Sequence, residues 1–458
     1  MNNIRSYLFA GLLVMSLSSC DHYLEVKTYG QKLPDTEEDY ATLLASQLTT
    51  FETYNDKTFG SPSLTLRNEC FSDNLNASLL TKTQTLMPMY VGDQISSTQY
   101  RYNEVYSCIK DYNIIIDNLE QRDSELGKKL LGASYAMRGA LYFHLMRECC
   151  EAYDADRSWQ IAGVPLVEHF DMEAKPGRGT IQDVIDFIER DLKTAIDYNM
   201  TDEKFHFTAD VARAYLARDY FWGQQWENAI TVAREVLEKY PLLSGSDYVN
   251  MIQSEKDRIG NVILKSYYTT SSTATRNYRN YITYSKYRPL DIRLLNLFAE
   301  GKRDIRYASF LDKDFLNAKG FNFRVRSAEM CLIIAESYAH LGQAGEALRY
   351  LNMLRENRIS GYKPLTETTL PAVNPDNLIK VDATGAPLTP LMQAILDERR
   401  KEFMMEGDRW YELKRNGSPE FWVGYEGVKY HTEKYLYTYP VSPRDLILNP
   451  NLVQNPGY

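Results

Sequence analysis

Two segments of the chain repeat one pattern of small and aromatic residues. The shared positions are Ala217, Tyr220 and Ala229 in the first segment and Ala335, Tyr338 and Ala347 in the second. The spacing is identical in both, and residues typical of turns lie between the alanines, at 224–225 and 342–345. Small residues at facing positions let two helix backbones approach closely, while the aromatic ring fills the adjacent gap. Each segment is therefore predicted to form a helical hairpin.

This spacing matches the tetratricopeptide pattern, in the first segment up to the helix-stopping Pro241. Helical periodicity also extends outside the repeats. Apolar residues follow a 3.6-residue period over 102–119, and a second run, rich in Ala, Leu, Tyr and Met, covers 131–150. Strand-like alternation is rare and short, as around 262–268. We predict an all-α fold, a tetratricopeptide-like scaffold of helical hairpins with long irregular loop insertions and minor short strands.

A further hairpin is suggested ahead of these two. Thr180 can cap a helix over 181–196, and Asp183 suits its first turn. Together with the aromatic pair Tyr142 and Phe143 on the preceding run, this helix could form another, interrupted pair.

The length of 458 residues would suffice for two or three domains. However, the motifs interleave along the chain, so we predict one domain over 20–458. Its loop-rich insertions are expected at about 68–101, 151–179, 242–323 and 361–390.

Tyrosine is unusually abundant, with 35 residues against 17 Phe and 5 Trp. Many tyrosines fall on helix stripes and are expected to fill packing. The stretch 267–287 is different, because it is polar, rich in Thr and Ser, and typical of a loop. Tyrosine faces stack on apolar rings and their hydroxyls bind polar groups, so we predict ligand contacts here and near residue 90. The candidate ligand-binding residues are Tyr90, Tyr100, Tyr267, Tyr268, Tyr281, Tyr284 and Tyr287.

Other side chains leave alternatives open. Arg276, Arg279 and Lys286 lie among these tyrosines and could instead serve an anionic sugar or a peptide carboxylate. Trp159 and Trp422 lie in connecting segments and could belong either to the core or to a binding surface, whereas the tryptophans within the scaffold motifs are expected in the core. Those three are Trp222, Trp226 and Trp410.

The N-terminus carries a targeting signal. Arg5 precedes an apolar run over 8–17 that is too short to span a bilayer and is typical of a signal peptide. The sequence Leu-Ser-Ser-Cys that ends at Cys20 resembles a bacterial lipobox. The resemblance implies that residues 1–19 are a lipoprotein signal peptide and that Cys20 is acylated, with palmitate among the acyl chains. Several acyl chains anchor a protein stably in a membrane.

Charge and side-chain spacing exclude some functions. The net charge of −9 argues against a nucleic-acid binder. The six His are scattered and no CxxC occurs, so no cofactor and no metal site built from residues close in sequence is expected. The five cysteines after Cys20 are expected to be mostly buried, unpaired apolar residues.

Three carboxylates, Glu398, Glu402 and Glu406, share one helix face beside several arginines. Paired carboxylates can serve acid–base catalysis. A structural ion-pair network near the scaffold surface is the interpretation we favour.

Four segments in the C-terminal part carry specific motifs. They are R-x-A-E…L-x-x-A-E at 326–336, N-x-x-R-x-x-R at 352–358, E-R-x-x-E-F-x-x-E-G-x-R-W-x-E-L-x-R at 398–415, and a terminus ending N-P-x-x-x-Q-N-P-G-Y at 449–458. These resemble the motifs of the SusD/RagB family of outer-membrane nutrient-binding lipoproteins. Glu412 and Asp445 stand where that family more often has Asp and Glu, and the resemblance spans nearly the whole mature chain.

The resemblance implies a non-catalytic lipoprotein anchored in the outer membrane and facing the cell exterior. Such a protein would bind a nutrient, an oligosaccharide in the first instance, and deliver it to a SusC-like TonB-dependent transporter. Two alternatives remain open from the sequence. One is a RagB-like lipoprotein that takes up peptides, and the other is a lipid-anchored glycan hydrolase.

Overall fold

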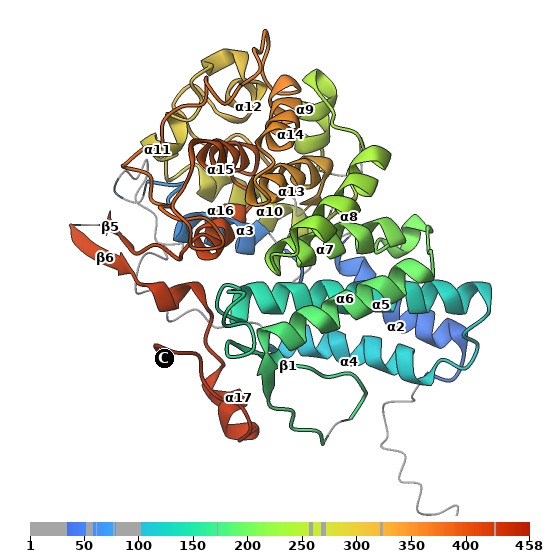
Figure 1. The fold of residues 1–458 in the computed structure, drawn as a ribbon. Helices are drawn as coiled ribbons and strands as arrows, with labels where there is room; N and C mark the ends of the chain where they lie inside the picture. The colour runs from blue at the N-terminus through green and yellow to red at the C-terminus, as the bar shows by residue number, and fades with distance from the viewer. Residues whose placement is uncertain are drawn as a thin grey trace, which may run out of the picture.

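The computed structural model describes residues 34–51, 58–60, 62–76, 78, 102–171, 173–255, 260–266, 272–320, 324–425 and 427–458. Cys20, Tyr90, Tyr100, Tyr267 and Tyr268 lie outside these residues. The described chain is dominated by helices, as predicted (Figure 1). None of its helices is long and apolar enough to cross a membrane.

The first group of helices runs through residue 239. Its members are α2 (Glu37–Phe51), α3 (Pro62–Phe71), α4 (Tyr102–Asn118), α5 (Glu125–Cys149), α6 (Ile181–Asp197), α7 (Ala209–Trp222) and α8 (Trp226–Lys239). Helix α4 confirms the helix expected over 102–119. Helix α5 begins six residues ahead of the apolar run at 131, because Ser124 accepts a hydrogen bond from the backbone N–H of Gly127 and caps the helix there.

The second group covers the rest of the chain. It comprises α9 (Gly245–Gln253), α10 (Ser272–Ser285), α11 (Ile292–Leu295), α12 (Ile305–Phe310), α13 (Ser327–His340), α14 (Ala344–Glu356), α15 (Pro390–Glu402), α16 (Asp408–Arg415) and α17 (Pro443–Leu448). Short 3₁₀ helices occupy Glu203–Phe205, Gly301–Arg303 and Lys434–Tyr437.

The strands are short, as predicted, and form two-stranded antiparallel sheets. The pairs are β1 (Ala162–Pro165) with β2 (Arg178–Thr180), β3 (Leu264–Lys265) with β4 (Arg324–Val325), and β5 (Phe421–Tyr425) with β6 (Val428–Thr432). The strand expected around 262–268 is thus reduced to two residues. The β5–β6 hairpin projects from the helical body (Figure 1).

Both predicted helical hairpins are present. Helices α7 and α8 form the first and α13 and α14 the second, and Ala217, Ala229, Ala335 and Ala347 are all fully buried. The turn between α7 and α8 places Gln224 at a positive φ of 55°. The small residues therefore lie where the pattern requires close packing.

The interrupted pair is confirmed by α5 and α6, which lie along one another (Figure 1). Thr180 accepts a hydrogen bond from the backbone N–H of Asp183 at 3.1 Å, and its own N–H donates to the Asp183 carboxylate at 2.7 Å. Between the helices, Arg138 and Asp191 form a buried ion pair with an Nε–Oδ2 distance of 2.7 Å.

One prediction about secondary structure is wrong. The stretch 267–287 was expected to form a loop, but residues 272–285 form α10, and α9, α11 and α12 lie in the same predicted insertion. The reason is a second apolar cluster, separate from the main core, that includes Tyr248, Tyr278 and Phe310. Packing of the tyrosine stripe of α10 on this cluster outweighs the weak helix propensity of a Thr- and Ser-rich sequence.

Candidate functional site

The described tyrosines of the predicted ligand-binding set lie along and just after α10. The rings of Tyr281 and Tyr284 have centroids 6.0 Å apart and stand nearly perpendicular, and those of Tyr284 and Tyr287 are 5.9 Å apart. Tyr287 is buried in the second cluster, whereas Tyr281 and Tyr284 are half-buried against it. The row is held rigidly, and two of its rings keep exposed area that a ligand can contact.

The residues that follow the tyrosine row, at 289–290, lie against residues 75–76. Leu75 and Leu290 form an isolated antiparallel bridge, and the backbone N–H of Asn76 donates to the carbonyl of Pro289 at 2.9 Å. Two residues further on, the Ser78 hydroxyl donates to the carbonyl of Gly424 in β5 at 2.7 Å. The structure thus brings residues 75–78, residues 289–290 after α10 and strand β5 together.

This hairpin adds an aromatic residue that sequence reasoning left undecided. Trp422 in β5 is 58% exposed, and the Lys429 ammonium lies 4.2 Å from the centroid of its ring. Trp159, the other undecided tryptophan, is 66% exposed. By contrast, Trp222 and Trp410 are buried, and Trp226 packs partly buried against the core. A short strand flanked by Gly417 and Gly427 was the available signal for an exposed hairpin at Trp422.

The carboxylates Glu398, Glu402 and Glu406 form an ion-pair network, as predicted, but not near the surface. They also do not share one helix, because α15 ends at Glu402 and Glu406 lies in the turn before α16. Glu402 contacts Arg306, Arg326 and Arg358 at 2.5–3.0 Å, and none of these side chains is more than 1% exposed. Burial alone would raise the pKa of Glu402, but the three guanidinium groups hold it well below its usual range. The network is buried because its arginines come from α12, from the N-cap of α13 and from the end of α14 and the residues after it, and all pack against the last turn of α15.

The neighbouring carboxylates are held in the same way. Glu398 pairs with Arg306 at 2.6 Å and with Arg355 at 2.6 Å. Glu406 pairs with Lys319 at 2.6 Å, and Arg326 and Lys319 together lower its pKa to about 2 against the effect of burial. A general acid needs a raised pKa and access to substrate. These carboxylates are instead ionised, paired and enclosed, so their role is structural.

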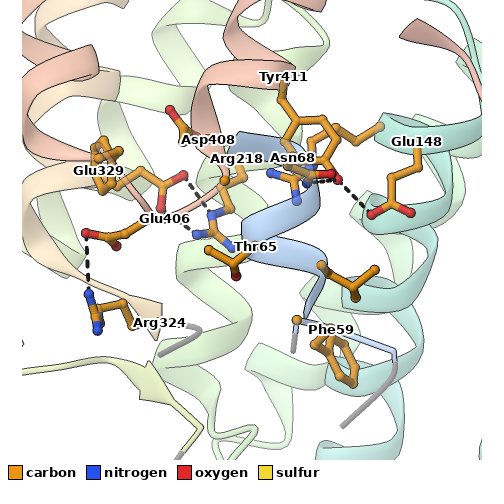
Figure 2. A pocket seen from close by; sticks show the side chains of 15 residues that line it. Phe59, Thr65, Asn68, Glu148, Arg218, Arg324, Glu329, Glu406, Asp408 and Tyr411 are labelled. Atoms are coloured by element: carbon orange, nitrogen blue, oxygen red, sulfur yellow. Dashed lines mark hydrogen bonds and ion pairs between the residues drawn. The ribbon is translucent and has the colours of Figure 1, made fainter. Parts of the chain in front are cut away.

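A small cavity lies beside this network (Figure 2). Its walls include the Arg218–Glu329 ion pair, and Tyr411, which donates to Glu148 at 2.8 Å. The volume of about 70 Å³ is far below the roughly 300 Å³ at which small-molecule sites begin. The cavity therefore has room for a few water molecules and not for a sugar ring.

The described residues contain no cluster of three or more His, Cys, Asp or Glu that could hold a metal ion. The five cysteines at 70, 108, 149, 150 and 331 are buried, as expected, and form no disulfide within the described part of the chain. Burial raises the pKa of Cys150 to about 11 and that of Cys331 to about 12, so these thiols stay protonated and unreactive.

Comparison with known proteins assigns the chain to a family. Residues 22–221 match the family model described as "Starch-binding associating with outer membrane", and residues 197–458 match the model of the SusD family. The sequence is similar to SusD-like protein P38 of Formosa agariphila, with 24% identity over 434 residues that cover 79% of this chain and 80% of that protein.

Solved structures share the fold. A SusD superfamily protein from Bacteroides thetaiotaomicron superposes with a TM-score of 0.70 at 20% identity, covering 92% of this chain and 100% of the other. A SusD-like carbohydrate binding protein from Bacteroides vulgatus gives a TM-score of 0.66 at 20% identity, covering 92% of this chain and 98% of the other. From the family models, which together extend from residue 22 to the C-terminus, the chain belongs to the SusD family.

Proposed function

We propose that this protein binds an oligosaccharide through a surface built around the half-buried tyrosines of α10. The observation that carries the proposal is the row of Tyr281 and Tyr284 on α10, packed against buried Tyr287 just after it, in a SusD-family scaffold. A rigid aromatic face loses little conformational freedom when a sugar ring stacks on it, which favours binding.

Tyr90, Tyr100, Tyr267 and Tyr268 remain predicted contributors to this surface. Trp422 on the β5–β6 hairpin is a further candidate for sugar stacking.

The membrane and transport roles are part of the same proposal. Acylated Cys20 would hold the protein at the outer membrane facing the cell exterior, and the bound glycan would pass to a SusC-like TonB-dependent transporter. Family membership and the lipobox support both steps. We further propose that the protein is not an enzyme, since the candidate carboxylates Glu398, Glu402 and Glu406 are enclosed in ion pairs.

A glycan array, followed by isothermal titration calorimetry, tests the ligand class. We expect saturable binding of at least one oligosaccharide, no binding of a matched panel of peptides, and no change in the glycan after prolonged incubation. Binding of peptides alone, or turnover of the bound glycan, would contradict the proposal.

The transport step has a separate test. A tagged chain extracted from outer membranes in mild detergent should copurify with a SusC-like TonB-dependent transporter, and a Cys20→Ala variant should lose acylation and membrane association. Recovery of the wild-type chain from the soluble fraction, without acylation, would contradict the anchoring.

A further inference from the structure

A second cavity lies away from the tyrosine row. With a volume of about 660 Å³, it opens between the connection at 151–161, the turn at 382–385, the end of α16 and the segment at 434–438. This volume falls within the range of about 300–1,000 Å³ typical of small-molecule sites. None of the described tyrosines predicted to bind ligand lines it.

The walls of this cavity offer aromatic and hydroxyl groups. Tyr153 and Tyr435 line it together with Thr384, Ser418 and Thr438. The Tyr153 hydroxyl donates to Gln182 at 3.1 Å, which fixes that ring in place. A site that combines aromatic faces with many polar groups suits a hydroxyl-rich ligand such as a sugar.

The end of α16 supplies two buried cations with unused donor capacity. Lys414 is 1% exposed, and its ammonium donates to the carbonyl of Arg147 at 2.8 Å. Glu148 and Glu151 lie near enough to act on its charge, but among the described residues no carboxylate forms an ion pair with it. Burial lowers the pKa of Lys414 to about 8, so it still carries most of its charge at neutral pH. Arg415 pairs with Glu336 through Nη2 at 2.6 Å, but its buried Nη1 has no hydrogen-bond partner among the described residues.

Most acids of the cavity are already engaged. Arg157 on the rim pairs with Glu151 at 3.6 Å and with Asp154 at 4.0 Å. Asp382 accepts backbone N–H bonds within its own turn at 2.9 and 3.1 Å. Asp156 stands on the exposed rim. Inside the cavity, Lys414 therefore keeps a positive charge without a carboxylate partner, and Arg415, although paired with Glu336, keeps one N–H donor available at Nη1.

We propose that this cavity is a second saccharide site, and that it accepts a sugar unit bearing a carboxylate, a uronate, whose charge is neutralised by Lys414 and which accepts a hydrogen bond from Nη1 of Arg415. This inference rests on the proposed binding of carbohydrate. It further specifies that the bound sugar is negatively charged and that it lies in this cavity. Charge-assisted hydrogen bonds from buried donors to a carboxylate are among the strongest in proteins, so the acid group would decide selectivity.

Titration calorimetry with tetragalacturonate and with a neutral galactose tetrasaccharide tests the proposal. We expect the wild-type protein to bind the acidic sugar at least about tenfold more tightly than the neutral one. Equal affinity for both sugars, or no binding of tetragalacturonate, would overturn the proposal.

Two variants locate the site. Lys414→Met removes the charge while keeping the length of the side chain, and Thr384→Trp fills the cavity from an exposed turn. Both should weaken tetragalacturonate binding at least about tenfold, whereas Lys193→Met, which removes an exposed cation from α6, should not. Thr384→Trp keeps the test decisive if Lys414→Met fails to fold.

A Tyr281→Ala/Tyr284→Ala variant separates the two proposals. Retained tetragalacturonate binding in this variant, with loss in Thr384→Trp, places the acidic sugar in the cavity. The reverse pattern would place it on α10, which would overturn the cavity site and leave the proposed function standing.

Discussion

Arg358, which follows α14, and Glu402, the last residue of α15, are joined by an Nε–Oε2 contact of 3.0 Å inside the protein. Neither side chain is more than 1% exposed. Glu402 also forms ion pairs with Arg306 and Arg326. This one carboxylate therefore connects α12, the start of α13 and the segment after α14 to the end of α15.

Removing the charge of Glu402 should strongly destabilise the protein. Glu402→Gln leaves buried guanidinium groups without their counter-ion, which costs about 3–5 kcal/mol in the free energy of unfolding. Urea titration measures this. The control Glu346→Gln breaks an exposed ion pair, in which the side chain of Glu346 is 44% exposed and that of Arg349 is 52% exposed. This loss should lower the free energy of unfolding by less than about 1 kcal/mol. Equal, small losses in both variants would contradict the structural role of Glu402.

The same network predicts sensitivity to acid. The pKa of Glu402 lies well below its usual range and that of Glu406 is about 2, so both carboxyls hold protons less readily in the folded protein than in the unfolded one. Their stabilisation is complete above the unfolded value of about 4.5 and is lost as pH falls from there towards 2. The urea midpoint of the wild type should fall steeply over that range and that of Glu402→Gln more gradually. Parallel profiles would contradict this.

Asp219 in α7 should destabilise the protein increasingly as pH rises. Its carboxylate is fully buried, and neither oxygen has a hydrogen-bond partner among the described residues. Burial, with Glu189 and Asp186 nearby, raises its pKa well above the usual range. The folded protein therefore binds this proton more readily than the unfolded one, and stability falls as pH rises above about 4.

Asp219→Asn should remove that penalty. Its gain in the free energy of unfolding should be near zero at pH 4 and grow by up to about 1.4 kcal/mol per pH unit until the folded pKa is passed. Melting temperatures across pH 4–8 would show it, with the exposed Asp197→Asn as control. A gain independent of pH would contradict the assignment.

Close packing in the first repeat hairpin predicts intolerance of larger side chains. Ala217 is fully buried, so Ala217→Leu should overpack the interface and cost about 1–3 kcal/mol, measured by urea unfolding. Ala308→Leu, at an exposed position of α12, should be nearly neutral. An unchanged stability for Ala217→Leu would mean that the α7–α8 contact is looser than the structure shows.

The repeat hairpins could be predicted because their signal is local. Ala217 and Ala229 lie within one short segment, and the turn between them is readable from the adjacent residues. The Thr180 cap was equally accessible, since all its partners lie within three residues.

The second apolar cluster could not be predicted in this way. Tyr248, Tyr278, Phe310 and Met405 come from distant segments and meet only when the chain folds, so the stripe on α10 looked like a polar loop. The ion pairs pose the same difficulty. Arg409 pairs with Asp73 at 2.8 Å across 336 positions, and nothing near either residue identifies its partner. Likewise, the 660 Å³ cavity is lined by segments that are far apart in the chain.

The central claim is that the tyrosine row of α10 contacts the sugar. The direct measurement is titration calorimetry of the best glycan from the array against the wild type, Tyr281→Ala/Tyr284→Ala, and Tyr198→Ala. Tyr198 is a matched control because it is half-buried and stacked on Tyr135, but it lies on the α5–α6 pair. The account predicts affinity at least about tenfold weaker for the double variant and unchanged for the control. Equal affinity in all three proteins, each with a cooperative thermal transition, would contradict it.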